Sequence, residues 1–362
     1  MKTLSIVGAR PQFIKIGPLS DELRQRHQEI LVHTGQHYDH GMSDSFFEEL
    51  DLPTPDYHLG IGSGLHGAQT GAMLAAIEAV LLKENPDAVI VYGDTNSTLA
   101  GALAAAKLHI PIAHVEAGLR SFNRAMPEEI NRVLTDHVST WLFAPSATAA
   151  ERLGREGIVG GVHIVGDIML DALRRHRERA LTRSEVLERL RLPPQGYYVA
   201  TVHRAENADD RQKLGGLVEA MSCLDLPVVF PLHPRTRGRM VEFGMKPGGN
   251  VRTLEPVGYL DMLALQAQAA CVLTDSGGVQ KEAYYLGVPC VTLRDETEWV
   301  ETLAAGWNVL AGTDPARILA AVRGRAREGN PPPLYGDGTT ARRIVSILSD
   351  WAQDGPVKGK KN

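Results

Sequence analysis

The chain has 362 residues, a length that favours two domains, and with 43% hydrophobic and 22% charged residues it is a folded globular protein, not a fibrous or disordered one. Its 38 basic and 43 acidic side chains give a net charge of -5, which excludes a global positive field for nucleic acid or an anionic membrane. The first residues run directly into an apolar, strand-like run, so we expect no cleavable leader, and the sequence has no run of ~20 apolar residues. Cys223, Cys271 and Cys290 stand at no metal-ligand spacing. We therefore expect a cytoplasmic protein with no metal.

Short apolar runs, turns and amphipathic helical stretches alternate along the first half, which is typical of βαβ units around a parallel sheet. Strands are expected at residues 4–8, 29–33, 88–92, 112–115, 141–144 and 162–165. The clearest helix is expected at residues 68–83, where Met73, Ile77 and Val80 share one face. An Ala-rich helix is expected at residues 96–108.

The second half repeats this pattern. Strands are expected at residues 197–202, 228–231, 251–254, 271–274, 290–293 and 309–310. A charged helix and connector, rich in Arg and Glu, lie between the halves. We expect domains at residues 1–170 and 171–340, then a helix from about residue 340 that can cross back to the first domain, and a solvated tail to 362. The fold class is α/β, with two Rossmann-like, doubly wound parallel sheets whose strand ends face a cleft.

Polar residues follow the strands of the first domain. Gly8 allows a tight turn into a helix whose N-terminus, with Arg10 and Lys15, can hold a phosphate; an ordinary turn with two surface cations is the other interpretation. The pattern matches neither a Walker nor a dinucleotide glycine motif. Asp94 either caps the following helix or supplies a carboxylate.

Glu116 follows the next strand, and Glu128 stands in the first turn expected after Pro127, where acidic residues also suit the helix dipole. Three carboxylates at strand ends and a helix start form a candidate acid/base cluster, because crowding can raise a carboxyl pKa towards a useful range.

Two strands of the second domain end in a histidine followed by arginine, at His203 and His233. Either histidine can titrate or donate to phosphate, or else bond to backbone. Ser276, Gly277 and Gly278 then open a helix, where backbone N–H groups and a hydroxyl suit a diphosphate. Glu282, one turn on, can accept from ribose hydroxyls. The combination favours a nucleotide-sugar enzyme.

The chain resembles the non-hydrolysing UDP-N-acetylglucosamine 2-epimerases, whose two-domain fold is similar to that of GT-B glycosyltransferases. The motifs that carry the resemblance run in order along nearly the whole chain: GARPQFIK, TGQHYD, GDTNST, HVEAGLRS, MPEEINR, HRAEN, LHPRTR, TDSGGVQKEA and RDETEWVET.

The resemblance implies reversible epimerisation at C2 of a UDP-acetamido sugar, by elimination and re-addition of UDP, in a homodimer that needs no cofactor. It implies Asp94, Glu116, Glu128 and His203 as catalytic residues. It implies that UDP is held by Arg10, Lys15, Arg132, His233, Ser276, Gly277, Gly278 and Glu282.

The chain departs from the commonest form of the family, which has GTRPE at the first turn and a TERPE-like run near the end. GARPQ and TEWVE, with Trp299 replacing arginine, resemble the branch acting on UDP-2,3-diacetamido-2,3-dideoxyglucuronate.

Some bacterial members of the family have an allosteric substrate site, and in this chain that site is incomplete. Gln36 and His37 fit, but Asp39 stands where glutamine is expected, and an arginine near His66 is absent. We expect weak or no substrate activation; a sigmoidal rate curve relieved by UDP-N-acetylglucosamine would contradict this.

The sequence leaves three alternative functions. A GT-B glycosyltransferase shares the fold but needs no carboxylate trio, and a hydrolysing relative differs only in letting water take the intermediate. A binding regulator without catalysis would need the carboxylates replaced, and all three are present.

Overall fold

The computed structural model describes residues 1–36, 46–325 and 329–354. It divides into unit 1, which comprises Met1–Arg174 and Leu334–Asn362, and unit 2, which comprises Arg175–Pro333. Within the described residues, none of the helices combines the length and hydrophobicity that a membrane crossing needs. The solvated tail predicted at the C-terminus lies outside the described residues.

Unit 1 is built on a seven-stranded parallel sheet in the order β3-β2-β1-β4-β5-β6-β7. The strands are β1 (Lys2–Val7), β2 (Gln28–His33), β3 (Tyr57–His58), β4 (Ala88–Tyr92), β5 (Ile112–Val115), β6 (Trp141–Ala144) and β7 (Val162–Ile164). Six of them confirm the predicted strands. The seventh, β3, was not predicted because two residues carry no readable periodicity.

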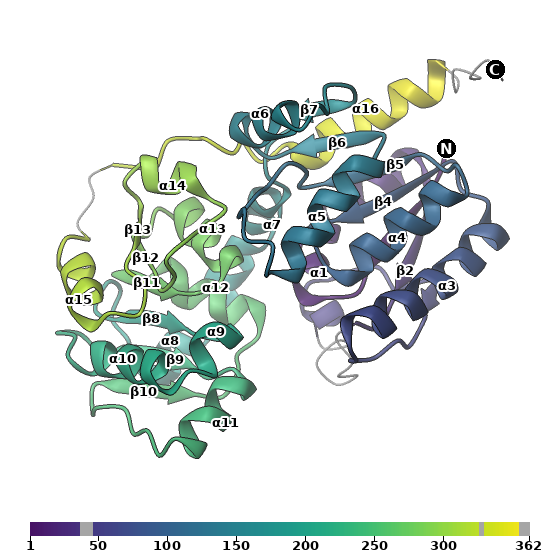
Figure 1. The fold of residues 1–362 in the computed structure, drawn as a ribbon. Coiled ribbons are helices and arrows are strands. Elements are labelled where there is room, and N and C mark those ends of the chain that lie inside the picture. Colours follow the sequence, from purple (N-terminus) through teal and green to yellow (C-terminus); the bar gives the residue numbers. More distant parts are fainter. Residues whose placement is uncertain (37–45, 326–328, 355–362) are drawn as a thin grey trace. The chain divides into compact units, whose positions relative to one another are not determined.

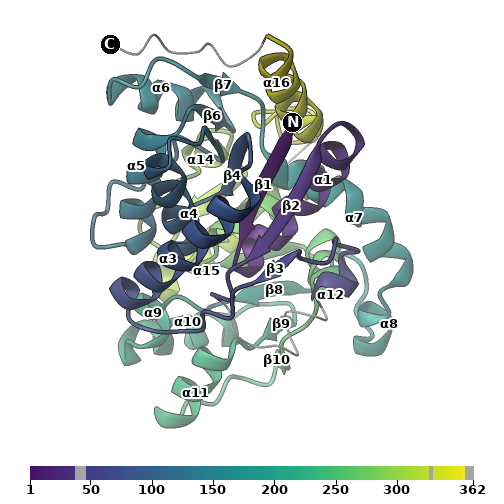
Figure 2. The same cartoon turned by 90° about the vertical axis from the view of Figure 1, so that its right-hand side faces the viewer.

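Helices cover both faces of this sheet (Figures 1 and 2). They are α1 (Arg10–Arg26), α3 (His66–Glu84), α4 (Asn96–Lys107), α5 (Pro127–Val138), α6 (Ala147–Arg155) and α16 (Thr340–Asp354), and α7 (Ile168–Arg183) leads into unit 2. Helices α3, α4 and α5 pack side by side on one face, while α1 and α16 lie together on the other. The small side chains of α4 allow close approach: a methyl group built on Gly101 would lie 2.6 Å from Ile6 Cδ1.

Helix α16 confirms the helix predicted at the C-terminus, and it packs within unit 1. Its Ser349 Oγ lies 2.8 Å from His27 Nε2, at the end of α1. Its start is fixed by the Ala341 N–H, which donates to Asp171 Oδ1 at 3.0 Å. The Trp351 ring meets Trp141 of β6 edge to face, with centroids 5.0 Å apart. Hence α16 completes the layer that α1 begins.

Unit 2 contains a six-stranded parallel sheet in the order β10-β9-β8-β11-β12-β13. All six strands confirm the prediction: β8 (Tyr198–Thr201), β9 (Val228–Pro231), β10 (Val251–Leu254), β11 (Cys271–Thr274), β12 (Cys290–Thr292) and β13 (Asn308–Leu310). The helices are α8 (Val186–Leu190), α9 (Ala205–Ala208), α10 (Arg211–Ser222), α11 (Pro234–Glu242), α12 (Tyr259–Ala267), α13 (Gly277–Leu286), α14 (Val300–Ala304) and α15 (Pro315–Arg323). Phe230, Leu273 and Val291 of the sheet share one buried core with Leu217 and Ile318 of the helices. The prediction of two parallel α/β sheets is thus confirmed.

Candidate active site

In each sheet the strand order reverses between two neighbours, β1 and β4 in unit 1 and β8 and β11 in unit 2. After β1 the chain enters α1 on one face, and after β4 it enters α4 on the other. Ligands of doubly wound sheets bind beside the carboxyl ends of such strands, where the connections diverge and leave room. The candidate residues at these strand ends therefore lie where doubly wound sheets bind their ligands.

Helix α1 begins without a capping side chain, because its N-cap residue is Ala9. Gln12 supplies the missing acceptor: its Oε1 receives hydrogen bonds from the N–H groups of Gly8 and Ala9, at 2.8 and 3.0 Å. Its Nε2 donates to the Tyr92 carbonyl at 2.9 Å, at the end of β4. The glutamine of GARPQ thus ties the first turn to the neighbouring strand. Sequence reasoning assigned Gln12 no role.

Lys15 and Glu116 form a buried ion pair. The Lys15 Nζ lies 2.5 Å from Glu116 Oε2, and each side chain is 8% exposed. Glu116 has a positive φ of 78°, which non-glycine residues seldom adopt, so the turn after β5 holds its carboxylate in a specific direction. Gly93, with φ 63°, gives Lys15 room, since a methyl group there would lie 3.1 Å from Nζ. Helix α1 therefore brings its lysine to the carboxyl ends of β4 and β5.

Asp94 forms the second ion pair of this region, with Arg132 Nη2 of α5. One interpretation of the sequence was that Asp94 caps α4, and this is wrong. The N-cap is Thr95, whose side chain accepts a hydrogen bond from the Thr98 N–H at 3.3 Å. The Asp94 backbone is also held, because Asn131 Nδ2 donates to its carbonyl at 2.9 Å. The side chain is 29% exposed and thus reachable by a ligand. We call Asp94, Glu116, Lys15 and Arg132 the carboxylate cluster.

The two glutamates at the start of α5 differ in their exposure. Glu128 is exposed, whereas Glu129 is buried and pairs with Arg132 Nη1 at 3.0 Å. Glu129 also accepts hydrogen bonds from the N–H groups of Ser121 and Phe122, at 2.8 and 2.9 Å. It therefore positions Arg132 for Asp94 and anchors the loop before α5. The sequence contained both glutamates but no signal for which one is buried.

Behind the carboxylate cluster lies a buried network that sequence reasoning did not identify. Asp136 Oδ1 lies 2.7 Å from His114 Nδ1, and its Oδ2 accepts from Arg120 Nη1 at 2.7 Å. Burial by itself would raise the pKa of Asp136, but the charges and hydrogen bonds of His114 and Arg120 lower it below its usual value. The His114 Nε2 lies 2.7 Å from the Gly93 carbonyl. The network thus fixes the backbone just before Asp94.

In unit 2, Asp275 after β11 organises the turn after β8. Its carboxylate accepts from the N–H groups of His203 and Arg204, at 3.1 and 3.0 Å, and lies 3.1 Å from His203 Nδ1. Burial would raise the pKa of Asp275, but the hydrogen bond and charge of His203, with the backbone donors, lower it. The His203 ring is 40% exposed and lies 5.8 Å from the His233 ring, centroid to centroid. The two predicted histidines therefore do come together.

His233 and Ser276 both serve as helix N-caps. His233 Nδ1 accepts from the Arg235 N–H at 3.2 Å, which is the backbone bond that one interpretation expected. Ser276 is the N-cap of α13, and its Oγ accepts a hydrogen bond from the Val279 N–H at 3.5 Å. The backbone of Gly277 and Gly278 follows as the first turn of that helix. We call Ser276, Gly277 and Gly278 the Ser-Gly-Gly turn; its N–H groups carry the partial positive charge that favours an anion.

Glu282, one turn further along α13, is 4% exposed. Gln266 Nε2 of α12 donates to its Oε2 at 2.7 Å. Burial raises the pKa of Glu282 to about 7, against the opposing hydrogen bonds of Gln266 and Tyr259 and the charge of Lys281. The folded protein therefore holds this proton more tightly than the unfolded chain does.

This shift predicts a specific pH dependence of stability. Because the folded-state pKa of Glu282 is raised, its stabilising contribution is complete below its ordinary value of 4.5 and is lost as the pH rises through about 7. In urea unfolding of the wild type, the free energy of unfolding should fall between pH 4.5 and 8. The part of this fall that is due to Glu282 should be on the order of 2–3 kcal/mol. Glu282→Gln should lack this pH-dependent loss of stability. Glu255→Gln is the control and should retain the loss, because the Glu255 side chain is 78% exposed. Identical pH profiles for wild type and Glu282→Gln would contradict the shift.

Arg10 and the described residues of the predicted allosteric site lie in unit 1. Arg10 lies over the Phe46 ring, 4.7 Å from its centroid. Gln36 accepts from the Ser97 N–H at 3.0 Å, and His66 Nδ1 lies 3.1 Å from Asn96 Nδ2. The other positions of the predicted incomplete allosteric site, His37 and Asp39, lie outside the described residues.

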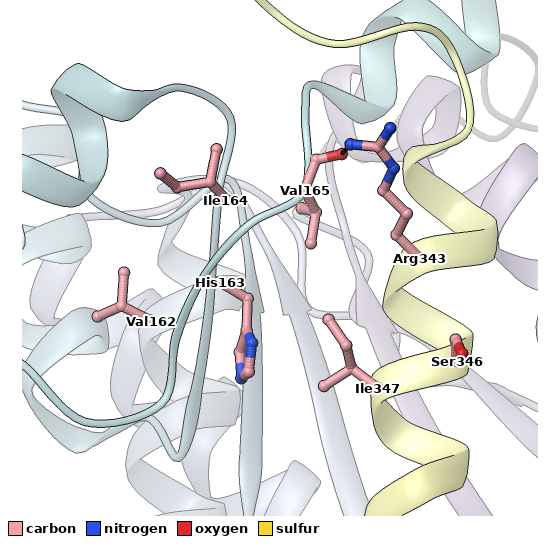
Figure 3. Close-up of a pocket in the computed structure, with 7 residues that line it drawn as sticks. All are labelled: Val162, His163, Ile164, Val165, Arg343, Ser346 and Ile347. Carbon is pink, nitrogen blue, oxygen red and sulfur yellow. Dashed lines mark hydrogen bonds between the residues drawn. The ribbon is translucent and has the colours of Figure 1, made fainter.

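A surface hollow of about 560 Å³ lies in unit 1, away from the strand ends (Figure 3). It is lined by β7, by Val165, which follows that strand, and by α16, where Arg343 Nη1 donates to the Val165 carbonyl at 3.5 Å. None of the predicted site residues lines it.

Comparison with known proteins identifies the family. A family model described as UDP-N-acetylglucosamine 2-epimerase matches residues 21–349. The chain belongs to this family. The match confirms the predicted epimerase family.

Relatives extend the match over nearly the whole chain. A UDP-N-acetylglucosamine 2-epimerase homolog of Methanococcus maripaludis is 51% identical, covering 96% of this chain and 99% of that protein. The UDP-2,3-diacetamido-2,3-dideoxy-D-glucuronate 2-epimerase of Pseudomonas aeruginosa is 50% identical, with the same coverage. Among solved structures, the Methanocaldococcus jannaschii UDP-GlcNAc 2-epimerase, in complex with UDP-GlcNAc and UDP, has a TM-score of 0.91 and 46% identity, covering 97% of this chain and all of that one.

Proposed function

We propose that this 2-epimerase interconverts UDP-N-acetylglucosamine and UDP-N-acetylmannosamine by eliminating UDP across C1 and C2 and adding it back. The observation that carries the proposal is the carboxylate cluster. Asp94 and Glu116 follow neighbouring strands, and each is paired with a cation from a different helix, Arg132 or Lys15. Carboxylates beside cations suit a reaction that moves a proton while a charged diphosphate departs.

The chemistry explains why such groups are needed. The C2 proton of the sugar has no adjacent carbonyl to acidify it, so removing it alone is unfavourable. Loss of UDP from C1 at the same time supplies a stable leaving group and gives a glycal-like intermediate. UDP then returns to C1 as a proton is delivered to the other face of C2. Atoms and electrons balance without an oxidant or a cofactor.

We assign roles to the residues accordingly. Asp94, Glu116 and Glu128 transfer protons, and His203 acts on the diphosphate side. Among the cations, Arg10, Lys15 and Arg132 stabilise the departing UDP by electrostatic attraction. In unit 2 the diphosphate is held by His233 and the Ser-Gly-Gly turn, and Glu282 accepts from the ribose hydroxyls.

Proton NMR of the enzyme with UDP-N-acetylglucosamine in heavy water tests this function. Deuterium should enter C2 while a UDP-N-acetylmannosamine signal appears, because the returning proton comes from solvent. Free N-acetylmannosamine would instead indicate hydrolysis. No exchange with this sugar or with the uronate considered next would overturn the proposed reaction.

UDP-2,3-diacetamido-2,3-dideoxyglucuronate is the second candidate substrate. It is favoured by the 50% identity to the Pseudomonas aeruginosa enzyme named for that sugar, together with Trp299 in the TEWVE run. The same elimination and re-addition apply at its C2. Deuterium incorporation with the uronate alone would keep the mechanism and replace the substrate.

We also propose that the enzyme is a homodimer. Ile130 and Leu134, one turn apart on α5, are 47% and 45% exposed, and nearby in sequence Phe122 is 71% exposed. Large apolar side chains exposed on one helix favour a protein contact. Light scattering should give twice the chain mass of 39.3 kDa. The exchange of Ile130 and Leu134 for glutamate should give monomers if α5 forms the contact.

A further inference from the structure

The Ser-Gly-Gly turn has a neighbour to which the proposed function assigns no role, the indole of Trp299. A methyl group built on Gly277 would lie 3.3 Å from the Trp299 Nε1. The indole nitrogen therefore sits directly beside the backbone of the first residue of α13. Indole nitrogen is only a donor, so this N–H adds to the donors of the turn. Trp299 is 4% exposed, so its ring has little freedom to turn away.

Lys281 contacts a face of the same ring. Its Nζ lies 3.9 Å from the Trp299 ring centroid, and Lys281 is 1% exposed. A cation over an indole face is attracted by the ring quadrupole, most strongly where water is excluded. Because Lys281 belongs to α13, this contact holds the indole against the helix whose first turn it flanks.

A buried polar network joins the TEWVE run to the middle of α13. Thr297 Oγ1 donates to Gln280 Oε1 at 2.7 Å, and the Trp299 N–H donates to Thr297 Oγ1 at 3.2 Å. Asn308 Nδ2 donates to the same Gln280 oxygen at 3.2 Å. Thr302 Oγ1 donates to the Trp299 carbonyl at 2.7 Å. The backbone on both sides of Trp299 is thereby fixed relative to α13.

A carboxylate also lies near the turn, and its partner Arg294 is shared with Glu206 and Glu296, at 3.7 and 3.8 Å. Glu298 Oε2 would lie 3.9 Å from a methyl group on Gly277. Arg294, with its side chain 1% exposed, pairs with the two oxygens of Glu298 at 3.2 and 3.3 Å. The pairing reduces the repulsion that an unpaired Glu298 would exert on an anion at the turn.

We propose that Trp299 is a diphosphate-binding residue, whose indole N–H donates to a phosphate oxygen held at the Ser-Gly-Gly turn. The inference rests on the proposed function, since it concerns the same UDP. Lys281 and the Thr297–Gln280 bond position the indole beforehand, so little rotamer freedom is lost on binding. The ring and the N–H of Trp299 therefore have separate tasks, packing on Lys281 and donating to phosphate.

Trp299→Phe separates the two tasks, because phenylalanine keeps an aromatic face for Lys281 but has no N–H. Affinities for UDP and for uridine are measured by calorimetry. Loss of a hydrogen bond to a charged group should weaken UDP binding about tenfold or more and leave uridine binding unchanged. Trp307→Phe, at another buried tryptophan of unit 2 that is 6% exposed, is the matched control and should change neither affinity.

Wild-type protein labelled with ¹⁵N-tryptophan gives a second test that does not depend on the variant's folding. The chain has four tryptophans, and the Trp299 indole N–H resonance should shift with UDP but not with uridine. Any one of three results would overturn this inference and leave the proposed function intact. They are an unchanged UDP affinity in Trp299→Phe, equal losses of affinity for UDP and uridine in that variant, and an indole signal that does not respond to UDP. Wild type that binds no UDP would overturn the proposed function, and this inference with it.

Discussion

Replacing Glu116 by glutamine is expected to lower kcat for epimerisation by roughly 10²–10⁴-fold. The amide keeps the size of the side chain, and its oxygen can still accept from Lys15, the partner of Glu116 at 2.5 Å. It cannot take a proton from C2. UDP affinity should stay near wild type, because the variant removes one negative charge and no donor to phosphate. Deuterium incorporation at C2 measures the chemical step, and calorimetry measures UDP binding.

Asp94→Asn should behave in the same way, since Arg132 can still donate to the amide oxygen. Glu151→Gln is the control, because that glutamate is 61% exposed on α6 in an ion pair with Arg155. Near-normal deuterium exchange in both Glu116→Gln and Asp94→Asn would exclude the carboxylate cluster as the proton-transfer site. Loss of UDP binding in step with kcat would indicate a structural role instead.

Replacing Arg120 by alanine is expected to destabilise the protein by about 3–5 kcal/mol, because it removes one partner of a buried ion pair. The Arg120 side chain is 1% exposed, and its Nη1 lies 2.7 Å from Asp136 Oδ2. Its Nε pairs with Glu156 at 2.7 Å. Without the guanidinium, Asp136 stays buried with His114 and the Gly118 N–H as partners. Urea unfolding at constant pH measures the change.

Arg155→Ala provides the comparison for that loss. Arg155 and Glu151 form an exposed pair on α6, at 71% and 61% exposure, and such pairs contribute about 0.3–0.5 kcal/mol. A similar small change in Arg120→Ala would show that the network behind the carboxylate cluster is not structural. A large change would also predict reduced turnover, since His114 of this network holds the Gly93 carbonyl next to Asp94.

Much of the fold follows from the sequence alone, because its determinants are local. A run such as Val89, Ile90 and Val91 is apolar throughout, as a strand buried on both faces must be, and it is bounded by turn residues. The alternation of these runs with helical stretches indicates parallel sheets. Since parallel strands end at one edge, the sequence also placed Asp94 and Glu116 on the same side of the sheet.

The pairings within the site depend on helix rotation, which local sequence does not encode. Glu128 and Glu129 are adjacent, and both suit a helix N-terminus; only the packing of α5 on the sheet buries Glu129 and exposes Glu128. Asp94 lies 38 positions before its partner Arg132, as their residue numbers show, so no spacing rule relates them.

The sequence by itself determined the element types, the parallel sheets and the strand ends that carry the chemistry, because hydrophobic periodicity and turn residues act over a few positions. The tertiary structure alone decided which cation meets which carboxylate, that α16 packs against α1, and that Trp299 flanks Gly277. These contacts join segments far apart along the chain, so they arise only when the packed helices and strands fix each side chain's direction.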